Sequence, residues 1–206
     1  MKRITYLLPL IMILACNTTT KKETSISGEN ENMVVQEVKE DKPESKKVSN
    51  STYLCKINGE DWAYTKASGI VSTHRKTKKR TALLTFKKKL KKGSESIQLH
   101  YDTDSKALVV ASLQLKFKNK DGKLFTCYYT LNPDNKSRKP QSTLSGTIDL
   151  SNTAAASGTA EITNITIDFE KKNLLNPENS TVTLTDLKFT GIGYSDIDKL
   201  SNAFKK

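Results

Sequence analysis

Apolar and polar residues alternate along most of the chain after about residue 50, which is the pattern of half-buried strands. In the segment 113–117, Leu and Phe occupy every second position. Asp121 and Gly122 follow, and the segment 123–131 then alternates again. Asp-Gly between two alternating runs is typical of a β-hairpin, so the two segments are expected to pair.

The segment 81–90 fits two periodicities. Its even positions are apolar except for Lys88, but three of its large residues also align as they would along one side of a helix. The threonines, the turn residue Gly93 and the alternation at 97–101 favour a strand followed by its hairpin partner.

Further strands are expected at 165–169 and 182–189. Within the second segment the apolar alternation changes parity, which predicts a β-bulge near Thr185 and Asp186. The sequence SGTIDLSN at 145–152 is similar to SGTAEITN at 157–164. Two adjacent strands joined by small residues explain this similarity without a repeat architecture.

Only the C-terminal stretch 195–206 is expected to be helical. Ile197, Leu200 and Phe204 fall on one side of such a helix, and Ser195 or Asp196 is a suitable N-cap. The fold predicted from all these segments is all-β: an antiparallel β-sandwich or a partly open barrel, with a short C-terminal helix, preceded by a disordered tether.

A different pattern opens the chain. Lys2 and Arg3 precede an apolar run over residues 4–14, and Ala15 and Cys16 follow it. The run is about half as long as the ~20 residues that a membrane-spanning helix needs. Residues 1–15 are therefore predicted to be a secretory signal peptide.

The residues Ile13, Leu14, Ala15 and Cys16 resemble the lipobox of bacterial lipoproteins, although that motif more often has a smaller residue where Leu14 stands. The resemblance implies cleavage before Cys16, a diacylglycerol on its sulfur and usually a further acyl chain on its amino group. Two or three such chains anchor a protein stably at a membrane, whereas one chain does not. A soluble secreted protein with a chance cysteine is the alternative.

Residues 17–50 have the composition of a tether. The stretch holds six Lys and seven acidic residues and few large apolar ones. Such a segment buries too little surface to offset the entropy lost on ordering. The predicted organisation is thus a signal peptide (1–15), lipidated Cys16 with a flexible tether (16–50), and one β-rich domain (51–206).

The charge of this domain is concentrated in one stretch. Of the 34 Lys and Arg and 22 acidic residues in the chain, the domain holds 26 and 15. The stretch 74–93 alone has ten cationic residues and no acidic one. These residues are Arg75, Lys76, Lys78, Lys79, Arg80, Lys87, Lys88, Lys89, Lys91 and Lys92. If the intervening residues form a strand, the two cationic clusters lie at its opposite ends.

Three interpretations of these clusters compete. Lysines on loops and edge strands keep neighbouring chains from pairing, which needs no ligand. Alternatively, the clusters contact an anionic surface such as phospholipid headgroups or acidic glycans. Nucleic acid is not an expected partner, because an exported protein meets little of it and the clusters lack interleaved aromatic residues. No protein partner is indicated.

Two cysteines remain in the domain, Cys55 and Cys127. Each shares its parity with apolar neighbours, so both are expected to face inward. Outside the cytoplasm a disulfide between them is the natural hypothesis, with two buried thiols as the alternative.

The chain lacks the sequence signatures of common active sites. There is no Gly-x-Ser-x-Gly, no His-Glu-x-x-His, no phosphate-binding glycine loop and no pair of closely spaced cysteines. His74 and His100 are the only histidines, and the carboxylates Asp102 and Asp104 are more simply turn residues. No catalytic residue, metal site or cofactor is expected.

The run YLCKINGEDWAYTKASG at 53–69 is similar to the start of many small β-rich lipoproteins of Gram-negative bacteria, with Asn58, Gly59 and Trp62 as the matching residues. Asn58-Gly59 also suits a type I′ turn. This resemblance implies the outer membrane as the location but no activity; which side of that membrane is left open. We expect a binding or structural module of the cell envelope. A lipocalin-like carrier of a small apolar ligand and an unrecognised envelope hydrolase are the alternatives; a cavity lined by Trp62 and the tyrosines would favour the carrier.

Overall fold

The alternating segments form ten strands and end in one short helix. A computed structural model of the chain describes residues 51–169 and 173–203, and all elements below lie within these ranges. The strands are β1 (Thr52–Ile57), β2 (Glu60–Tyr64), β3 (Lys66–Thr73), β4 (Arg80–Lys89), β5 (Ser94–Asp102), β6 (Leu108–Lys118), β7 (Leu124–Leu131), β8 (Thr143–Asp149), β9 (Ala155–Thr166) and β10 (Thr181–Asp196). The helices are the 3-10 turns η1 (Lys136–Arg138) and η3 (Pro177–Ser180) and the α-helix α1 (Ile197–Ala203).

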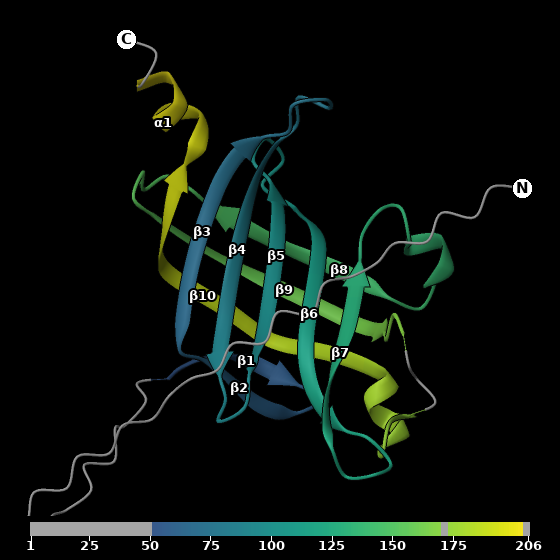
Figure 1. Ribbon diagram of the computed structural model, residues 1–206. Coiled ribbons are helices and arrows are strands. Elements are labelled where there is room, and N and C mark those ends of the chain that lie inside the picture. The colour runs from purple at the N-terminus through teal and green to yellow at the C-terminus, as the bar shows by residue number, and fades with distance from the viewer. Residues whose placement is uncertain (1–50, 170–172, 204–206) are drawn as a thin grey trace, which may run out of the picture. The chain divides into compact units, whose positions relative to one another are not determined.

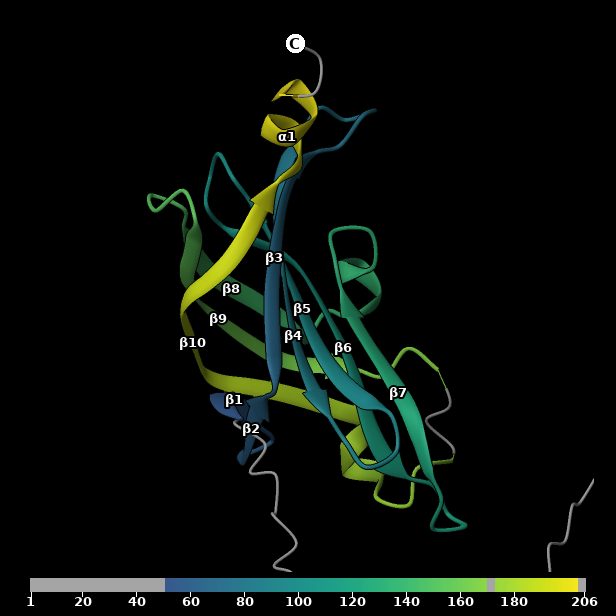
Figure 2. The ribbon, with the colours of Figure 1, turned by 60° about the vertical axis from the view of Figure 1, so that its left-hand side comes forward.

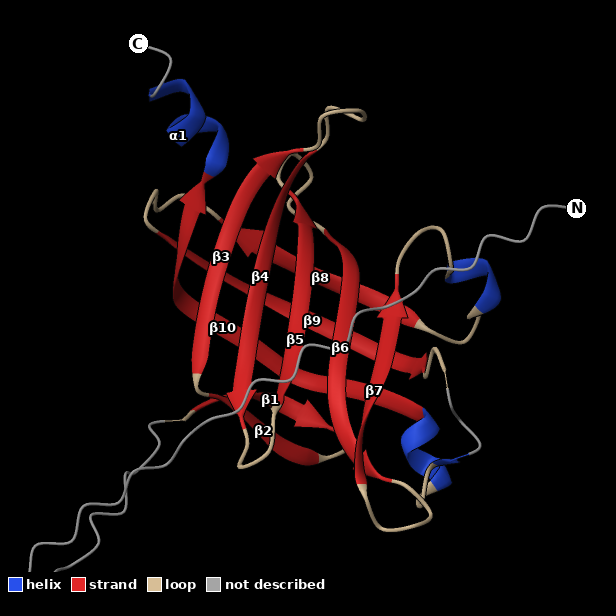
Figure 3. Ribbon diagram, in the orientation of Figure 1, coloured by secondary structure: helices blue, strands red, loops and turns tan. Residues whose placement is uncertain are grey.

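The strands form two layers. In Figure 1 the front sheet consists of β3, β4, β5, β6 and β7, and the back sheet consists of β2, β1, β10, β9 and β8. The strands of the two sheets cross at a steep angle (Figure 3), which is the orthogonal type of sheet packing. Every strand pairing is antiparallel except that of β10 with β3. The predicted antiparallel β-sandwich with a C-terminal helix is therefore confirmed.

Strand β10 belongs to both sheets. Its first part pairs with β1 and β9 in the back sheet, and its last residues pair with β3 in the front sheet. Between these parts the register with β9 shifts and Gly191 adopts a φ of +67°, so the strand bends around the side of the sandwich (Figure 2). Gly69 allows β3 to approach there, because a Cβ on it would lie 2.7 Å from the Cβ of Tyr194.

The sheets do not close into a barrel on the opposite side. The ladder of paired strands ends at β7 in front and at β8 behind. Isolated bridges hold these margins together, among them Tyr129 with Ile167 and Ala107 with Thr147. Of the two architectures that the sequence left open, the structure therefore has the sandwich.

Side chains fill the space between the sheets. The aromatic rings of Tyr64, Phe86, Phe189 and Tyr101 follow one another across the interior, with centroid distances of 5.3, 5.4 and 6.1 Å. The hydroxyl of Tyr101 donates to the carbonyl oxygen of Thr159 at 3.0 Å, which ties the front sheet to the back sheet. Residues 51–206 thus contain the whole described core and are the folding unit used in the experiments below.

Several local predictions are confirmed. Asn58 and Gly59 have φ values of 50° and 87°, as a type I′ turn requires, and join β1 to β2. Asp186 has a φ of 57° at the predicted bulge, where the register with β9 shifts. The two similar segments are β8 and β9, which pair directly.

One expectation needs correction, and the predicted cap of the C-terminal helix is confirmed. Strand β9 ends at Thr166, and Phe169, which was expected to lie on the inner face of a strand, is 73% exposed. The C-terminal helix begins at Ile197 because β10 continues through Asp196, whose Oδ1 accepts from the Lys199 amide at 3.3 Å. Asp196 is thus the N-cap, one of the two candidates; Phe204 lies outside the described residues.

Candidate functional site

The two cationic clusters lie at opposite ends of β4. Arg75, Lys76, Lys78 and Lys79 belong to the exposed loop between β3 and β4, at the top of Figure 1, and Arg80 begins the strand. Lys87, Lys88 and Lys89 end β4, and Lys91 and Lys92 occupy the turn to β5. We call these groups the upper and the lower cluster.

Part of the upper cluster has a structural role. Arg80 Nη2 donates to Asp196 Oδ2 at 2.5 Å, and Lys199 Nζ lies 3.7 Å from the same oxygen. Burial acts to raise the pKa of Asp196, but hydrogen bonds and charges from Lys199 and Arg80 outweigh it and hold the pKa below its ordinary value. Arg80 therefore fastens β4 to the end of β10.

The three lysines that end β4 do not face the same way. Lys88 shares the inner face of the strand with Phe86; its ammonium lies 3.6 Å from Glu95 Oε2 and 6.0 Å from the centre of the Trp62 ring. Lys87 and Lys89 point outward and are exposed. In the sequence, Lys88 interrupts the apolar face of the segment 81–90. Its ion pair with Glu95 accounts for a lysine at this position.

The register of the front sheet adds two lysines to the lower cluster. Lys66 on β3 lies directly opposite Lys87. Lys116 on β6 lies two residues after Gln114, which is aligned with Lys87 through Ser96, and so it is on the same face of the sheet; its ammonium donates to the Thr126 hydroxyl at 2.9 Å. Sequence reasoning missed both because they are distant from 87–92 along the chain. Lys88 is left out of the lower cluster because it faces inward to Glu95. With Lys66 and Lys116 added, the lower cluster consists of Lys66, Lys87, Lys89, Lys91, Lys92 and Lys116.

The lower cluster has no carboxylate partner. Throughout residues 51–169 and 173–203, the ion pairs involve Arg80, Lys88, Lys139 and Lys199, and none involves a lysine of this cluster. The outward positions aligned with Lys87 on β5 and β6, Ser96 and Gln114, are uncharged. The positive charges of the lower cluster are therefore not offset by an ion pair within the described residues.

Next to the lower cluster, strands β5, β6 and β7 present polar, uncharged side chains on the outer face of the front sheet. Antiparallel register aligns two rows across strands β3 to β7. The first row is Lys66, Lys87, Ser96, Gln114 and Tyr128, and the second is Ser68, Thr85, Gln98, Ser112 and Thr130. A shallow groove of about 150 Å³ runs over the part of these rows on β5, β6 and β7. We call this the polar face.

A second concavity lies at Trp62, where the sandwich opens at its lower end. Ile57, Leu115 and Phe117 form its apolar walls, and its volume is about 210 Å³. Glu95 is fixed there, accepting from Trp62 Nε1 at 2.9 Å and from the Lys116 amide at 3.1 Å. Trp62 itself is only 4% exposed and belongs to the core, so its main role is packing.

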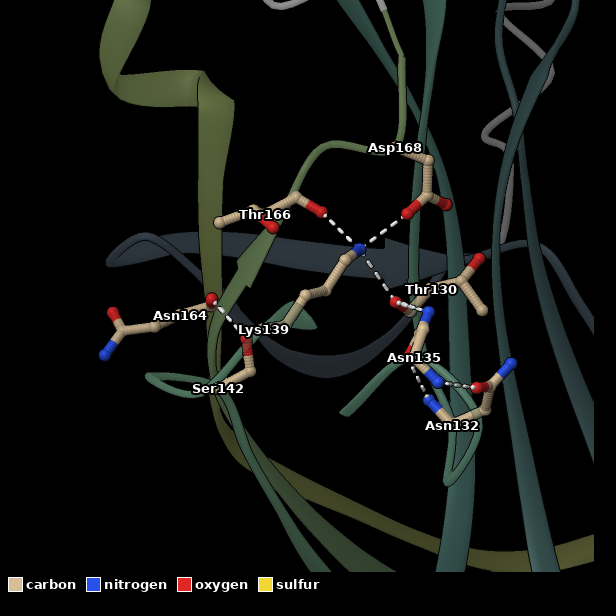
Figure 4. A network of polar contacts seen from close by, with 8 residues as sticks. All are labelled: Thr130, Asn132, Asn135, Lys139, Ser142, Asn164, Thr166 and Asp168. Atoms are coloured by element: carbon tan, nitrogen blue, oxygen red, sulfur yellow. Dashed lines mark hydrogen bonds and ion pairs between the residues drawn. The ribbon is translucent and has the colours of Figure 1, made fainter. Parts of the chain in front are cut away.

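A largely buried lysine joins the margins of the two sheets, and sequence reasoning did not identify it. Lys139 Nζ donates to the carbonyl oxygens of Thr130 and Thr166 at 2.9 and 2.8 Å and to Asp168 Oδ1 at 2.5 Å (Figure 4). These acceptors come from the end of β7, the end of β9 and the segment after β9. Because all three donor positions of the ammonium are used, Lys139 acts as a structural clamp.

The disulfide expected between Cys55 and Cys127 is not formed in the structure. Both side chains are buried, as predicted, but they lie on β1 in the back sheet and on β7 in the front sheet, which do not pair. The arrangement is the alternative of two buried thiols. Burial raises the pKa of the Cys55 thiol to about 12, so this thiol is unreactive in the folded protein.

Asp102 and His74, two of the titratable residues considered for catalysis, accept hydrogen bonds within their own turn and loop. Asp102 Oδ1 accepts from the amides of Asp104 and Ser105 and from the Ser105 hydroxyl, which confirms the interpretation as a turn. His74 Nδ1 accepts from the amide of Thr77 within its own loop. Burial lowers the pKa of His100. In the described ranges, no three His, Cys, Asp or Glu residues gather as a metal site would require.

The predicted lipid-attachment residue Cys16 lies outside the described residues, as do the predicted signal peptide and tether. The helices within the described ranges are too short or too polar to span a bilayer. Comparisons of the chain with protein-family models, curated proteins and solved structures gave no match.

Proposed function

We propose that the protein is a lipid-anchored binding module of the cell envelope and that its lower cluster docks onto an anionic surface. The N-terminal signal and the lipobox-like residues ending in Cys16 support export and anchoring, with the outer membrane of a Gram-negative bacterium as the proposed location. The domain at 51–206 then meets its ligand at or near that membrane.

The observation that carries the proposal is the cross-strand pair of Lys66 and Lys87. Like charges directly opposite each other in a sheet are destabilising, and their Cβ atoms lie only about 5 Å apart. Lys89 and Lys116 add charge on the same face, and no described carboxylate offsets it. An anionic ligand relieves the repulsion between these lysines. The repulsion destabilises the free protein, so its relief adds to the free energy of binding.

Protection of a sheet edge does not account for these lysines. Edge lysines prevent pairing between chains, but β4 lies between β3 and β5, and β6 lies between β5 and β7. Lys87, Lys89 and Lys116 thus stand on interior strands, where there is no open edge to protect. This distinguishes Lys87, Lys89 and Lys116 from the four cations in the exposed loop between β3 and β4.

The two alternative functions have less support. A carrier needs an internal cavity, but the interior is filled by residues such as Phe86, Leu99 and Phe189, and the room at Trp62 is at the surface. A hydrolase needs a converging set of catalytic groups, whereas Asp102, Asp196 and Glu95 are engaged in a turn, a helix cap and an ion pair.

The test compares two variants with the same loss of charge. One changes Lys66, Lys87, Lys89 and Lys116 to Gln, and the other changes Arg75, Lys76, Lys78 and Lys79 to Gln. Binding of residues 51–206 is measured to anionic phospholipid vesicles and to polygalacturonate, each at low and high salt. At about 1 kcal/mol per lysine, the first variant is expected to lose about 100-fold or more in affinity at low salt.

The second variant is expected to keep most of its affinity, because its charges lie at the other end of β4. Equal losses in the two variants would mean that net charge alone attracts the ligand and would contradict the proposal. Absence of binding to both anionic ligands would also contradict it.

A further inference from the structure

We infer that the surface which the lower cluster docks onto is an acidic glycan, a chain of sugars carrying carboxylate or sulfate groups. This inference rests on the proposed function and names the ligand class of the same site. The polar face continues the row of Lys66 and Lys87 across the front sheet, and its side chains indicate the ligand class.

The side chains of the polar face match hydroxyl groups. Gln98 and Gln114 each present both a donor and an acceptor, and Ser96, Ser112 and Thr130 do the same with one hydroxyl. A sugar hydroxyl also donates and accepts, so neighbouring hydroxyls of a sugar can satisfy an amide from both sides. A phosphate group offers acceptors alone, so it pairs with the donor side of these groups and not with their amide oxygens.

Tyr128 supplies the apolar contact that a sugar ring needs. It is 49% exposed on β7, opposite Gln114, and it lies at the end of the row that begins with Lys66 and Lys87. The flat ring of a tyrosine packs against the C–H face of a pyranose while its hydroxyl stays in water. The aromatic group, the amides and the cations therefore lie in one line.

The spacing of this line fits a polymer. Adjacent strands are about 4.8 Å apart, an interval close to the length of one pyranose unit. From Lys87 on β4 to Tyr128 on β7 the row crosses three strand intervals, or about 14 Å. The lysines then pair with the acidic groups at one end of the bound segment, while the amides and Tyr128 bind the sugars beyond them.

Charge is also complementary along the whole face. The two aligned rows contain lysines, hydroxyls, amides and one tyrosine, and no Asp or Glu. A bound acidic glycan therefore meets no repelling group on these rows. The side chains concerned point away from the core, so truncating them leaves the packing between the sheets intact.

The experiment is isothermal titration of residues 51–206 with a hexamer of galacturonic acid, its uncharged methyl ester, inorganic polyphosphate and anionic vesicles. The variants are Gln114→Ala and Tyr128→Ala, with Gln141→Ala as the matched control outside the polar face. Thermal unfolding of each variant verifies that it is folded.

We expect Gln114→Ala and Tyr128→Ala each to weaken binding of the acidic hexamer about tenfold and to change binding of polyphosphate and vesicles by less than twofold. The control is expected to bind all ligands as the unchanged protein does. The methyl ester should bind more weakly than the acid but remain sensitive to Gln114→Ala.

If neither variant differs from the control while the anions still bind through the lysines, the inference is wrong and the proposed function stands with a ligand recognised by charge alone. Equal or tighter binding of vesicles, with the same variants unaffected, identifies a lipid surface and also overturns the inference. If no anionic ligand binds, the proposed function itself fails.

Discussion

The clamp at Lys139 makes a prediction about stability that is independent of any ligand. Its side chain is 11% exposed and that of Asp168 is 18% exposed, so both charges are largely removed from water. Replacing Lys139 by Met keeps the apolar stem but leaves the Asp168 carboxylate without a counter-ion and removes a donor from the Thr130 and Thr166 carbonyls.

The size of the effect follows from these contacts. Removing one partner of a fully buried ion pair costs about 3–5 kcal/mol, and a hydrogen bond to a charged group contributes about 1.5–3 kcal/mol. Because both partners keep some contact with water, we expect the free energy of unfolding to fall by about 3 kcal/mol. With a urea m-value of about 2 kcal/mol/M, the unfolding midpoint falls by about 1.5 M.

Urea unfolding of residues 51–206 measures this change. Lys136→Met on the exposed η1 turn is the control and should shift the midpoint very little. Adding Asp168→Asn to the Lys139→Met variant should recover part of the loss, because the buried carboxylate is then neutral. A Lys139→Met variant as stable as the control would refute the assignment of Lys139 as a clamp.

Three further predictions concern other parts of the fold. Gly69→Ala should lower the free energy of unfolding by about 1–3 kcal/mol, because the new methyl group would clash with Tyr194; calorimetry measures this, and an unchanged melting temperature would contradict the close approach of β3 and β10. His100 has a lowered pKa, so the unfolded chain binds more protons and stability should fall on acidification below the ordinary value of 6.5; the fall should be smaller in His100→Gln, and equal slopes would rule out His100 as its source. Cys55 and Cys127 should resist alkylation in the folded protein and give two adducts after unfolding without reductant, whereas no adduct would reveal a disulfide.

The sequence predicts the strands well because each one has a buried and an exposed face. In β7, Cys127 and Tyr129 alternate with Thr126 and Tyr128, and this alternation depends only on neighbours in the chain. The same is true of the Asn58-Gly59 turn, where the residue types determine the backbone conformation. Such local signals also located the bulge at Asp186.

The arrangement of the strands could not be predicted in the same way. The sharing of β10 between two sheets depends on a bend at Gly191 and on contact with β3, more than a hundred residues earlier in the chain. Phe169 continued an alternating pattern beyond the point where β9 has a pairing partner, so the pattern alone placed it wrongly.

The candidate site shows the same limit. The lysines at 87–92 are evident from the sequence, but Lys66 and Lys116 join them only through the register of the front sheet. Gln114 and Tyr128 likewise join the row of Lys87 only when β4 to β7 are aligned. Lys88 was counted with the cluster, although it faces Glu95 and Trp62 instead.

The measurement that tests the central claim most directly is a residue-resolved NMR titration of residues 51–206 with polygalacturonate. The account predicts amide shift changes on the outer face of the front sheet, at Lys87, Ser96, Gln114 and their neighbours, that fade as salt is added. The loop 74–79 should change little. Shift changes centred on that loop, or spread evenly over both sheets, would contradict the assignment of the binding surface.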